Sequence, residues 1–377
     1  MKTETIKGFK DFIGNESKKR AEIKKILIDV FEKYNFEPAE TPVIEYEEFV
    51  RGNNSNDEAV SDIFKLQDKG KRKLALRYEF TFQLKRLARN KKLPYKRYQI
   101  GPVFRDEPIQ GNRARQFTQC DIDIIGSSIK DDAEILAMSK QILDNLKIKS
   151  VIYVNSRKLL NEIFDEQKIK KNREQVFREI DKLDKISEKE IKKNLKNLNA
   201  EKILAIFKKP ESYFKKYNSY KEIIKLKKYC KNYGVKIIFQ PWLIRGLSYY
   251  NGNIFEIKSE IKETICGGGS YLVNGIQSTG ISLGLERLSI LAKIKSSKEK
   301  ILVISLNQDK EAIKISQQLR KQGKNVSMFY GKPSRALEYA NAYKIQKVIF
   351  VGEKEIKNKK FKIKDMTSGC TKPLYHP

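Results

Sequence analysis

Histidine is almost absent from this chain of 377 residues, because His376, next to the C-terminus, is the single one. The four cysteines are Cys120, Cys230, Cys266 and Cys370, and no two of them form a C-x-x-C pair. We therefore expect no zinc site of ordinary spacing. Ser-His-Asp or Cys-His catalysis is close to excluded, because no imidazole is placed to act as a base. Any chemistry must come from arginine, lysine, carboxylates and backbone groups.

Long apolar runs are also absent, and acidic residues are outnumbered by basic ones. No stretch of about 18 apolar residues exists to span a membrane, and residues 1–7 have no apolar core typical of a signal peptide. We therefore expect a soluble cytoplasmic protein with no membrane partner. Lys and Arg number 78 against 47 Asp and Glu, a net charge of +31. This excess favours a polyanionic partner such as nucleic acid, but a genome-wide bias toward lysine explains the same numbers equally well.

The pattern along the chain predicts several parts. Residues 15–34 predict an amphipathic helix with Ile23, Leu27, Val30 and Phe31 on its apolar side. Residues 153–236 are rich in lysine and poor in glycine, and are typical of solvated helices. From residue 298 strands at 301–306, 326–330 and 347–351 alternate with helices at 309–322 and 334–343, which predicts a small domain with a mainly parallel sheet. The predicted divisions are 1–152, 153–236, 237–297 and 298–377.

Two segments place polar side chains on predicted strands. Residues 97–105 and 115–125 read as a pair of strands, and the second carries an aromatic, an amide and two carboxylates on one face. These are Phe117, Gln119, Asp121 and Asp123. Burying these polar groups in a core without hydrogen-bond partners costs free energy, so this face of the strand is either exposed to solvent or directed at a ligand. A strand through residues 74–81 would likewise bring Glu79 and Thr81 to one face.

The most informative stretch is Arg245-Gly246-Leu247-Ser248-Tyr249-Tyr250-Asn251-Gly252-Asn253-Ile254-Phe255-Glu256. It combines an arginine, two tyrosines and a glycine that lets the backbone approach a ligand. Its Asn-Gly dipeptide predicts a hairpin turn. The segment 267–269, three glycines in a row, predicts a second close approach.

These residues carry a family resemblance. The Arg245–Glu256 stretch resembles the histidine-binding signature of histidyl-tRNA synthetases. Residues 104–119, with Phe104-Arg105-Asp106-Glu107, Arg113, Phe117 and Gln119, resemble motif 2 of class II synthetases, and residues 280–287 resemble motif 3. The helix and Pro-containing strand at 15–46 resemble motif 1, and residues 180–185 resemble the insertion of archaeal and eukaryotic-type enzymes. The resemblance implies an α+β catalytic domain with the antiparallel class II synthetase sheet, a helical insertion domain and a C-terminal α/β anticodon-binding domain.

The resemblance also implies a reaction, in which ATP with Mg²⁺ activates histidine and the product is transferred to tRNA(His) by a homodimer. Arginine suits such chemistry, because its fork is always charged and binds phosphate or carboxylate at two points. By resemblance the catalytic residues are Arg105, Arg245 and Arg287. The ATP contacts are Arg105, Glu107, Arg113, Phe117 and Arg287, and the histidine contacts are Glu79, Thr81, Gln119, Asp123, Tyr250 and Tyr271.

The chain departs from the family pattern at a few positions. Ser248 stands where the signature has Asp, while Ser270 and Leu272 replace Arg and Asp after the glycines. Asp123 stands where bacterial relatives usually carry Glu. Two alternatives therefore stay open at this point, a non-catalytic paralogue that senses histidine or tRNA, and a general basic RNA-binding protein.

Overall fold

The computed structural model describes residues 1–52, 58–109, 114–184, 186–246, 249–261, 263–294, 299–358 and 361–373. The chain divides into two compact units, Met1–Ile294 and Lys295–Pro377, each with hydrophobic clusters of its own. The finer division at residues 153, 237 and 298 stays a prediction. No helix among the described residues is long and apolar enough to cross a membrane.

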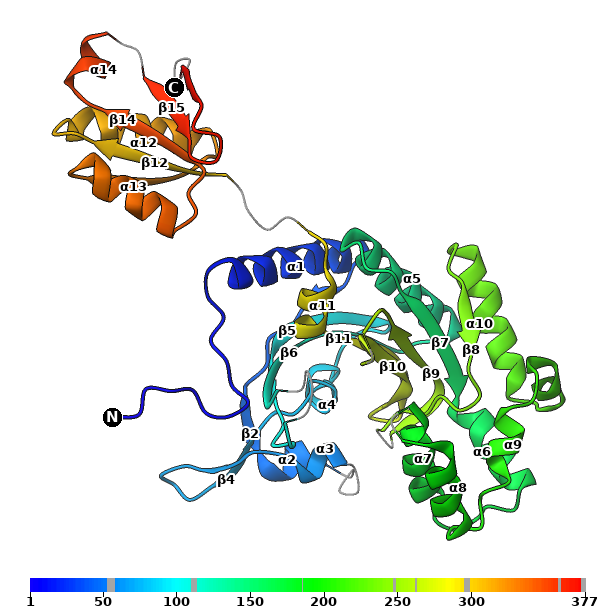
Figure 1. Ribbon diagram of the computed structural model, residues 1–377. Coiled ribbons are helices and arrows are strands. Elements are labelled where there is room, and N and C mark those ends of the chain that lie inside the picture. The colour runs from blue at the N-terminus through cyan, green and yellow to red at the C-terminus, as the bar shows by residue number, and fades with distance from the viewer. Residues whose placement is uncertain are drawn as a thin grey trace. The chain divides into compact units, whose positions relative to one another are not determined.

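The first unit is built on a curved sheet of eight strands (Figure 1). In spatial order they are β1 (Glu37–Pro38), β5 (Tyr95–Phe104), β6 (Gln116–Ile125), β11 (Ile276–Gly284), β10 (Cys266–Val273), β9 (Tyr250–Lys258), β7 (Val151–Ser156) and β8 (Ile237–Phe239). The six central strands pair antiparallel, as predicted, whereas the two edge strands β1 and β8 pair parallel. The sheet is therefore mixed.

One face of this sheet packs against helices. Cys120, Ile122 and Ile124 of β6 are buried in the same apolar cluster as Ile23 and Leu27 of α1 (Gly14–Lys33). The predicted apolar side of α1 is thus confirmed. The helices α5 (Ile129–Asn145) and α11 (Leu285–Leu291) lie beside α1 on this face (Figure 1). The alternate residues of β6 therefore point to the opposite face, which carries the candidate site.

A three-stranded sheet and short helices precede β5. The strands are β2 (Ile44–Tyr46), β3 (Lys65–Gln67) and β4 (Lys73–Leu76), and the helices are α2 (Glu47–Arg51), α3 (Glu58–Ser61) and α4 (Leu84–Leu87). The predicted strand through residue 81 is wrong, because β4 ends at Leu76 and the chain turns. The turn lets the rings of Tyr78 and Phe82 stack, with centroids 5.9 Å apart, in a cluster of their own. Glu79 and Thr81 therefore lie on a loop rather than on one strand face.

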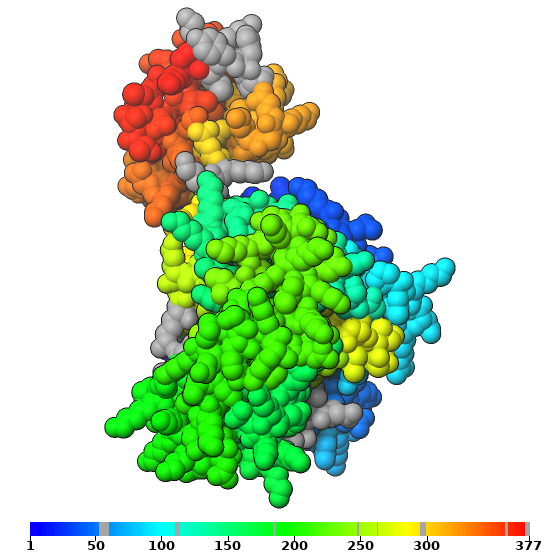
Figure 2. Space-filling view, turned by 90° about the vertical axis from the view of Figure 1, so that its right-hand side faces the viewer, coloured from blue at the N-terminus to red at the C-terminus, as the bar shows by residue number. Residues whose placement is uncertain are grey.

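Between β7 and β8 the chain is helical. Its elements are α6 (Arg157–Glu166), α7 (Arg173–Ile180), η1 (Asp181–Asp184), α8 (Glu188–Lys196), α9 (Ile203–Phe207), η2 (Glu211–Lys216) and α10 (Tyr220–Asn232). Figure 2 shows this green segment covering much of one side of the first unit. Its apolar residues join the main core, and α10 packs on α5.

The predicted turn at Asn251-Gly252 is wrong, because both residues lie inside β9. Gly252 faces β10 there, where an added Cβ would lie 3.0 Å from Ser270 Cβ. The hairpin turn is made instead by Asn274 and Gly275, which join β10 to β11 with φ of 50° and 79°. Positive φ at both positions is the requirement of the favoured two-residue turn.

The second unit alternates strands and helices as predicted. Its sheet has the order β13-β12-β14-β15-β16, in which the first three strands are parallel and the last two antiparallel. Its elements are β12 (Lys300–Ser305), α12 (Asp309–Lys321), β13 (Asn325–Tyr330), α13 (Pro333–Ala342), β14 (Lys347–Val351), α14 (Glu353–Lys357), β15 (Lys362–Asp365) and β16 (Thr371–Pro373).

Candidate active site

A cavity of about 220 Å³ opens on the face of the main sheet that the helices leave uncovered. Its walls come from β6, β10, β11 and the start of α11, and from the segments before β9 and after β5. Six residues predicted from distant parts of the sequence line it: Arg105, Glu107, Phe117, Gln119, Arg245 and Arg287. The fold therefore brings together the three predicted catalytic arginines.

A chain of hydrogen bonds connects two of these arginines. Arg245 Nη1 lies 2.6 Å from Glu256 Oε1, and the other oxygen of Glu256 accepts from Thr264 Oγ1 at 2.9 Å. The carbonyl oxygen of Thr264 accepts from Arg287 Nη1 at 2.5 Å. Glu256 belongs to β9 and Arg287 to α11, so the two cations are held at fixed positions on one wall.

The close approach predicted for the glycine run is occupied by Arg245. A Cβ added at Gly267 would lie 2.5 Å from the Arg245 guanidinium, so only glycine leaves room for it. Burial opposes the charge of Arg245, but Glu256, Tyr250 and Asp181 of η1 together outweigh it, so the pKa of Arg245 is raised above its ordinary value. Of the two carboxylates, Glu256 ends the signature stretch and Asp181 lies outside it. Ser248 itself lies outside the described residues.

Arg105 faces an aromatic wall of the cavity. Its guanidinium lies over the ring of Phe117, 5.2 Å from the centroid, and its Nε donates to the carbonyl oxygen of Tyr78 at 3.2 Å. Glu107 Oε1 lies 3.8 Å from Arg105 Nη1. A flat apolar ring beside a cation and a carboxylate fits a nucleotide base with its phosphate. Arg113, the fourth predicted phosphate contact, lies outside the described residues.

The start of α11 is tied to β6 by a buried arginine. Arg20 Nη2 donates to Thr118 Oγ1 and to Glu286 Oε1, each at 2.9 Å. Both Glu286 oxygens accept from the Thr118 backbone N–H at 3.1 Å. Since Arg287 follows Glu286, this contact fixes where Arg287 enters the cavity.

Tyrosines and carboxylates gather next to the arginine-lined cavity. Tyr271 donates a hydrogen bond to Asp123, and Tyr249 donates to Glu79 Oε2 at 3.3 Å. The Tyr249 ring contacts the other two, with its centroid 4.8 Å from that of Tyr250 and 5.5 Å from that of Tyr271. Burial raises the pKa of Tyr249 well above its ordinary value, and a hydrogen bond from Thr81 opposes this. Every predicted histidine contact except Gln119, which belongs to the cavity wall, thus lies in this cluster.

Two buried carboxylates follow Gln119 along β6. Burial raises the pKa of Asp121 to about 7, with Asp123 adding to the rise and Arg97 opposing it. Burial also raises the pKa of Asp123, against the effects of Arg97 and Tyr271. Asp121 Oδ1 is buried and has no hydrogen-bond partner among the described residues, and the same is true of Gln119 Oε1. Gln119 lines the cavity, and an unsatisfied acceptor there fits a ligand that donates hydrogen bonds.

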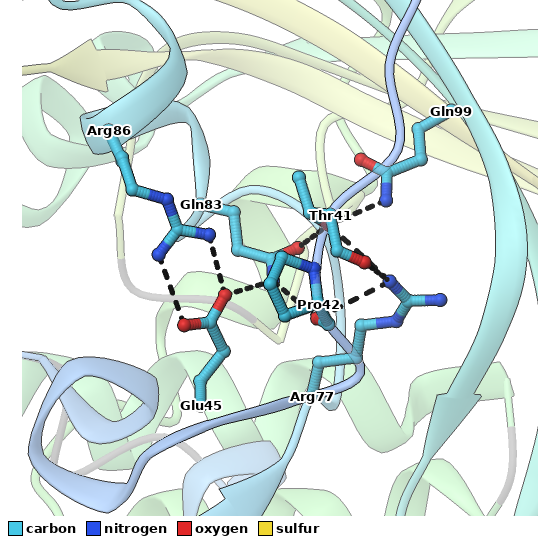
Figure 3. Close-up of polar contacts among 7 residues, drawn as sticks. All are labelled: Thr41, Pro42, Glu45, Arg77, Gln83, Arg86 and Gln99. Atoms are coloured by element: carbon cyan, nitrogen blue, oxygen red, sulfur yellow. Dashed lines mark hydrogen bonds and ion pairs between the residues drawn. The ribbon is translucent and has the colours of Figure 1, made fainter.

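A polar network anchors the loop that carries Glu79 and Thr81 (Figure 3). Gln83 Nε2 donates to Pro42 O at 3.0 Å and to Glu45 Oε1 at 2.7 Å, and Arg86 forms a two-point pair with the same carboxylate. Arg77 donates to Thr41 O at 2.7 Å, and Gln99 of β5 donates to Thr41 Oγ1 at 2.7 Å. The loop is therefore held to the segment before β2 and to the main sheet.

The departures at Ser270 and Leu272 lie away from the cavity. Ser270 Oγ donates to Asp132 of α5, 3.2 Å from each carboxylate oxygen, on the helix-covered side of the sheet. Burial raises the Asp132 pKa to about 6. Leu272 is 51% exposed. Neither replacement removes a group from the described walls of the site.

Among the described residues no three His, Cys, Asp or Glu side chains are grouped to hold a metal ion. Glu286, which lines the cavity, is paired with Arg20, and Glu256 is paired with the lining residue Arg245.

Some contacts of the site were not predicted from the sequence. Glu256 and Tyr249 lie in the Arg245–Glu256 stretch and Gly267 in the predicted close-approach segment, but the sequence did not indicate their partners. Arg97 was missed altogether, because one arginine beside a lysine carries no signal in a chain with 78 basic residues.

Comparison with known proteins agrees with this geometry. The family model described as histidyl-tRNA synthetase matches residues 8–288, and an anticodon binding domain matches residues 300–374. Histidine–tRNA ligase 1 of Bacillus cereus is 32% identical over 411 aligned residues, covering 98% of this chain and 94% of that protein. The crystal structure of histidyl-tRNA synthetase from Nostoc sp. PCC 7120 matches with a TM-score of 0.85 at 26% identity, covering 99% of this chain and 97% of that one.

A further solved structure shows how widely the fold is shared. An ATP phosphoribosyltransferase regulatory subunit/histidyl-tRNA synthetase from Bacillus halodurans matches with a TM-score of 0.77 at 20% identity, covering 92% of this chain and 98% of that one. At that identity the likeness concerns the fold alone.

A mixed sheet with six antiparallel central strands and arginines on its open face, followed by a separate α/β unit, defines a class II aminoacyl-tRNA synthetase fold. Within that class the chain belongs to the histidyl-tRNA synthetase family. The predicted family and fold class are confirmed.

Proposed function

We propose that this protein is a histidine–tRNA ligase, which activates histidine with ATP and transfers it to the 3′ end of tRNA(His). The observation that carries the proposal is the convergence of Arg105, Arg245 and Arg287 on one cavity beside the tyrosine–carboxylate cluster, in a chain of this family. A non-catalytic sensor would need the histidine cluster but not a wall of fixed cations.

In the first step, a carboxylate oxygen of histidine attacks the α-phosphorus of ATP, and the bond to pyrophosphate breaks. Negative charge builds on the α-phosphate oxygens, so fixed cations lower the barrier without acid–base chemistry. Arg105 holds the α-phosphate and the attacking carboxylate, and Arg245 approaches the α-phosphate from the opposite wall. Arg287 holds the terminal phosphates with Arg113, while Phe117 stacks on adenine and Glu107 accepts from its amine.

The histidine substrate presents donors to the carboxylate-rich side. Glu79, Thr81 and Gln119 bind its ammonium with the support of Tyr271, and Asp123 and Tyr250 bind its imidazole. Tyr271 already donates to Asp123, which orients that carboxylate. A subsite of buried acceptors rejects analogues that lack the matching donors by large factors.

ATP is the nucleotide substrate and would carry Mg²⁺ on its phosphates. Mg²⁺ keeps several waters and commonly binds through substrate phosphates with one or two carboxylates. Because Arg245 stands at the α-phosphate side, we propose that Mg²⁺ serves mainly the terminal phosphates.

In the second step, the aminoacyl group moves from AMP to a ribose hydroxyl of the terminal adenosine of tRNA(His), and AMP leaves. We propose that the unit from residue 298, matched by the anticodon-binding family, reads the anticodon. Residues 153–236 would form a helical insertion within the catalytic domain 1–152 and 237–297, and its lysines attract tRNA phosphates. We further propose a homodimer acting in the cytoplasm.

Histidine-dependent exchange of labelled pyrophosphate into ATP tests the proposal. We expect exchange with histidine and none above background with the other amino acids at equal concentration. The absence of exchange with histidine at high protein concentration, with folding verified, would contradict it. Binding of histidine without exchange would support a sensor instead.

A further inference from the structure

One buried arginine lies beneath the histidine cluster without lining the cavity. Arg97 of β5 is completely buried, and strand pairing places it directly opposite Asp123 of β6. Its Nη2 lies 2.7 Å from Asp123 Oδ2. Burying an arginine costs several kcal/mol unless its charge is matched, so an inward-facing arginine in this sheet calls for an explanation.

The same nitrogen reaches the other end of the histidine cluster. Arg97 Nη2 also donates to the carbonyl oxygen of Phe80 at 3.4 Å. Phe80 stands between Glu79 and Thr81, the two proposed ammonium contacts on the loop. One guanidinium group therefore contacts both the carboxylate of Asp123, which is proposed to bind the imidazole, and the backbone between the two residues that are proposed to bind the ammonium.

Arg97 is the main positive charge near Asp123. The groups that face Asp123 are Arg97 from β5, Tyr271 from β10 and Asp121 from β6 itself. Tyr271 is neutral and donates to Asp123, and Asp121 is of like charge. Arg97 Nε and Nη1 are buried without a hydrogen-bond partner among the described residues, and the carboxylate that its guanidinium contacts directly is that of Asp123, while its charge also acts on Asp121.

We propose that Arg97 is a positioning residue for histidine recognition, which keeps Asp123 an ionised acceptor for the imidazole N–H and fixes the Glu79–Thr81 loop at the matching distance. The proposal rests on the proposed function. It also explains how the shorter Asp123 can serve where relatives usually carry Glu. Arg97 on the neighbouring strand β5 holds the Asp123 carboxylate in place, so Asp123 does not need the longer side chain of Glu to bind the imidazole.

The test is pyrophosphate exchange with the full chain carrying Arg97→Met, which removes the charge and keeps most of the volume. We expect the KM for histidine to rise about 10- to 100-fold, as for loss of a charge-assisted contact, with the KM for ATP within about twofold. The ratio of variant to wild-type KM for histidine should grow as the pH falls from 8.5 to 6.5, because Asp123 without Arg97 takes up a proton. Comparison as a ratio cancels the titration of histidine itself.

Lys96→Met is the matched control. Lys96 is the neighbouring residue on β5 and pairs with a carboxylate, Glu134, at 2.7 Å on the helix-covered face. Its KM for histidine should equal that of the wild type. Should Arg97→Met fold poorly, Arg97→Met with Asp123→Asn removes both buried charges, and its KM for histidine should not exceed that of Asp123→Asn alone.

The outcomes separate the two proposals. Exchange by the wild type, with an unchanged KM for histidine in Arg97→Met or with equal rises for histidine and ATP, would overturn the role of Arg97 alone. Additive effects in the double variant would overturn it too. No histidine-dependent exchange by the wild type would instead overturn the proposed function.

Discussion

At the scale of single residues, the site depends on buried charges that are matched one by one. Arg245 is paired with Glu256, and Arg97 with Asp123. Removal of one partner from such a pair leaves a buried charge unmatched, which costs more than the pair contributes. Gly267 also supports the site, because its lack of a side chain leaves room for the Arg245 guanidinium.

Gly267→Ala is predicted to impair catalysis more than folding. The new Cβ would lie 2.5 Å from the Arg245 guanidinium, which can move aside because it is the end of a flexible side chain. We expect kcat for pyrophosphate exchange to fall about 10- to 100-fold, since misplacing a catalytic group by about 1 Å costs that much. Gly70→Ala, whose Cβ would meet Asp68 at 3.4 Å far from the site, is the control. Equal kcat values for both variants would contradict the assigned position of Arg245.

Asp121→Asn is predicted to change how stability depends on pH. Burial raises the Asp121 pKa to about 7, above the ordinary value of about 3.9 that applies in the unfolded chain. The folded state therefore binds the proton more tightly, and this contribution is complete below about pH 4 and lost as the pH rises through 7. Denaturant unfolding at pH 5 and pH 8 should show the wild type losing on the order of 3 kcal/mol relative to Asp121→Asn. Parallel losses in both proteins would mean that Asp121 titrates normally.

At the scale of elements, the loop from Arg77 to Gln83 matters more than its lack of regular structure suggests. Its hydrogen bonds attach it to the segment before β2 and to β5 (Figure 3). Loops that position functional groups need this support from a rigid scaffold. The network therefore fixes the loop that carries Glu79 relative to residues 41–45.

Gln83→Leu is predicted to loosen this loop. Gln83 is fully buried, and the substitution leaves Pro42 O with only the longer contact from Arg77 at 3.5 Å and Glu45 with Arg86 alone. We expect unfolding free energy to fall by about 1–3 kcal/mol for the buried polar groups that lose a partner, and the KM for histidine to rise. Arg72→Ala breaks the exposed pair with Asp68 and should cost less than about 1 kcal/mol. A rise in KM for ATP as large as that for histidine would argue against a specific role for the loop.

The elements of the fold differ in how far the sequence predicts them. The apolar period predicted α1, and alternation predicted β5, β6 and the second unit, because local patterns set which face is buried. Loop geometry was not predictable. Tyr78 stacks on Phe82 across a turn, in a segment for which strand propensity alone predicts a strand. Asn251-Gly252 reads as a turn, but pairing of β9 with β10 overrides it.

Partners across strands were the least predictable part of the site. Arg97 and Asp123 are 26 positions apart, and only the register of β5 on β6 places them together. The arginines of the motifs could be found because they lie in recognisable stretches. Glu256 ends the signature stretch, but nothing in the sequence indicates that it pairs with Arg245, and Thr264 has no sequence signal of its own.

At the scale of the whole molecule, the two compact units have separate hydrophobic clusters, so each can fold around its own core. The proposed activation site lies wholly in the first unit, whereas the anticodon-binding family matches the second. A chain ending at Ile294 is therefore predicted to keep histidine-dependent pyrophosphate exchange within a few fold and to charge tRNA(His) at least about 10-fold less efficiently, because tRNA affinity depends on its phosphate contacts. Loss of exchange in a folded truncated chain, or undiminished charging, would contradict this division of labour.

The central claim is that fixed arginines, with Arg245 foremost, stabilise the charge that develops when histidine attacks ATP. The most direct measurement is histidine-dependent pyrophosphate exchange by the wild type and by Arg245→Ala. We predict exchange by the wild type and a kcat lowered about 100- to 1,000-fold in the variant, the usual effect of removing one preorganised group that stabilises transition-state charge. A variant that exchanges at the wild-type rate would contradict the claim.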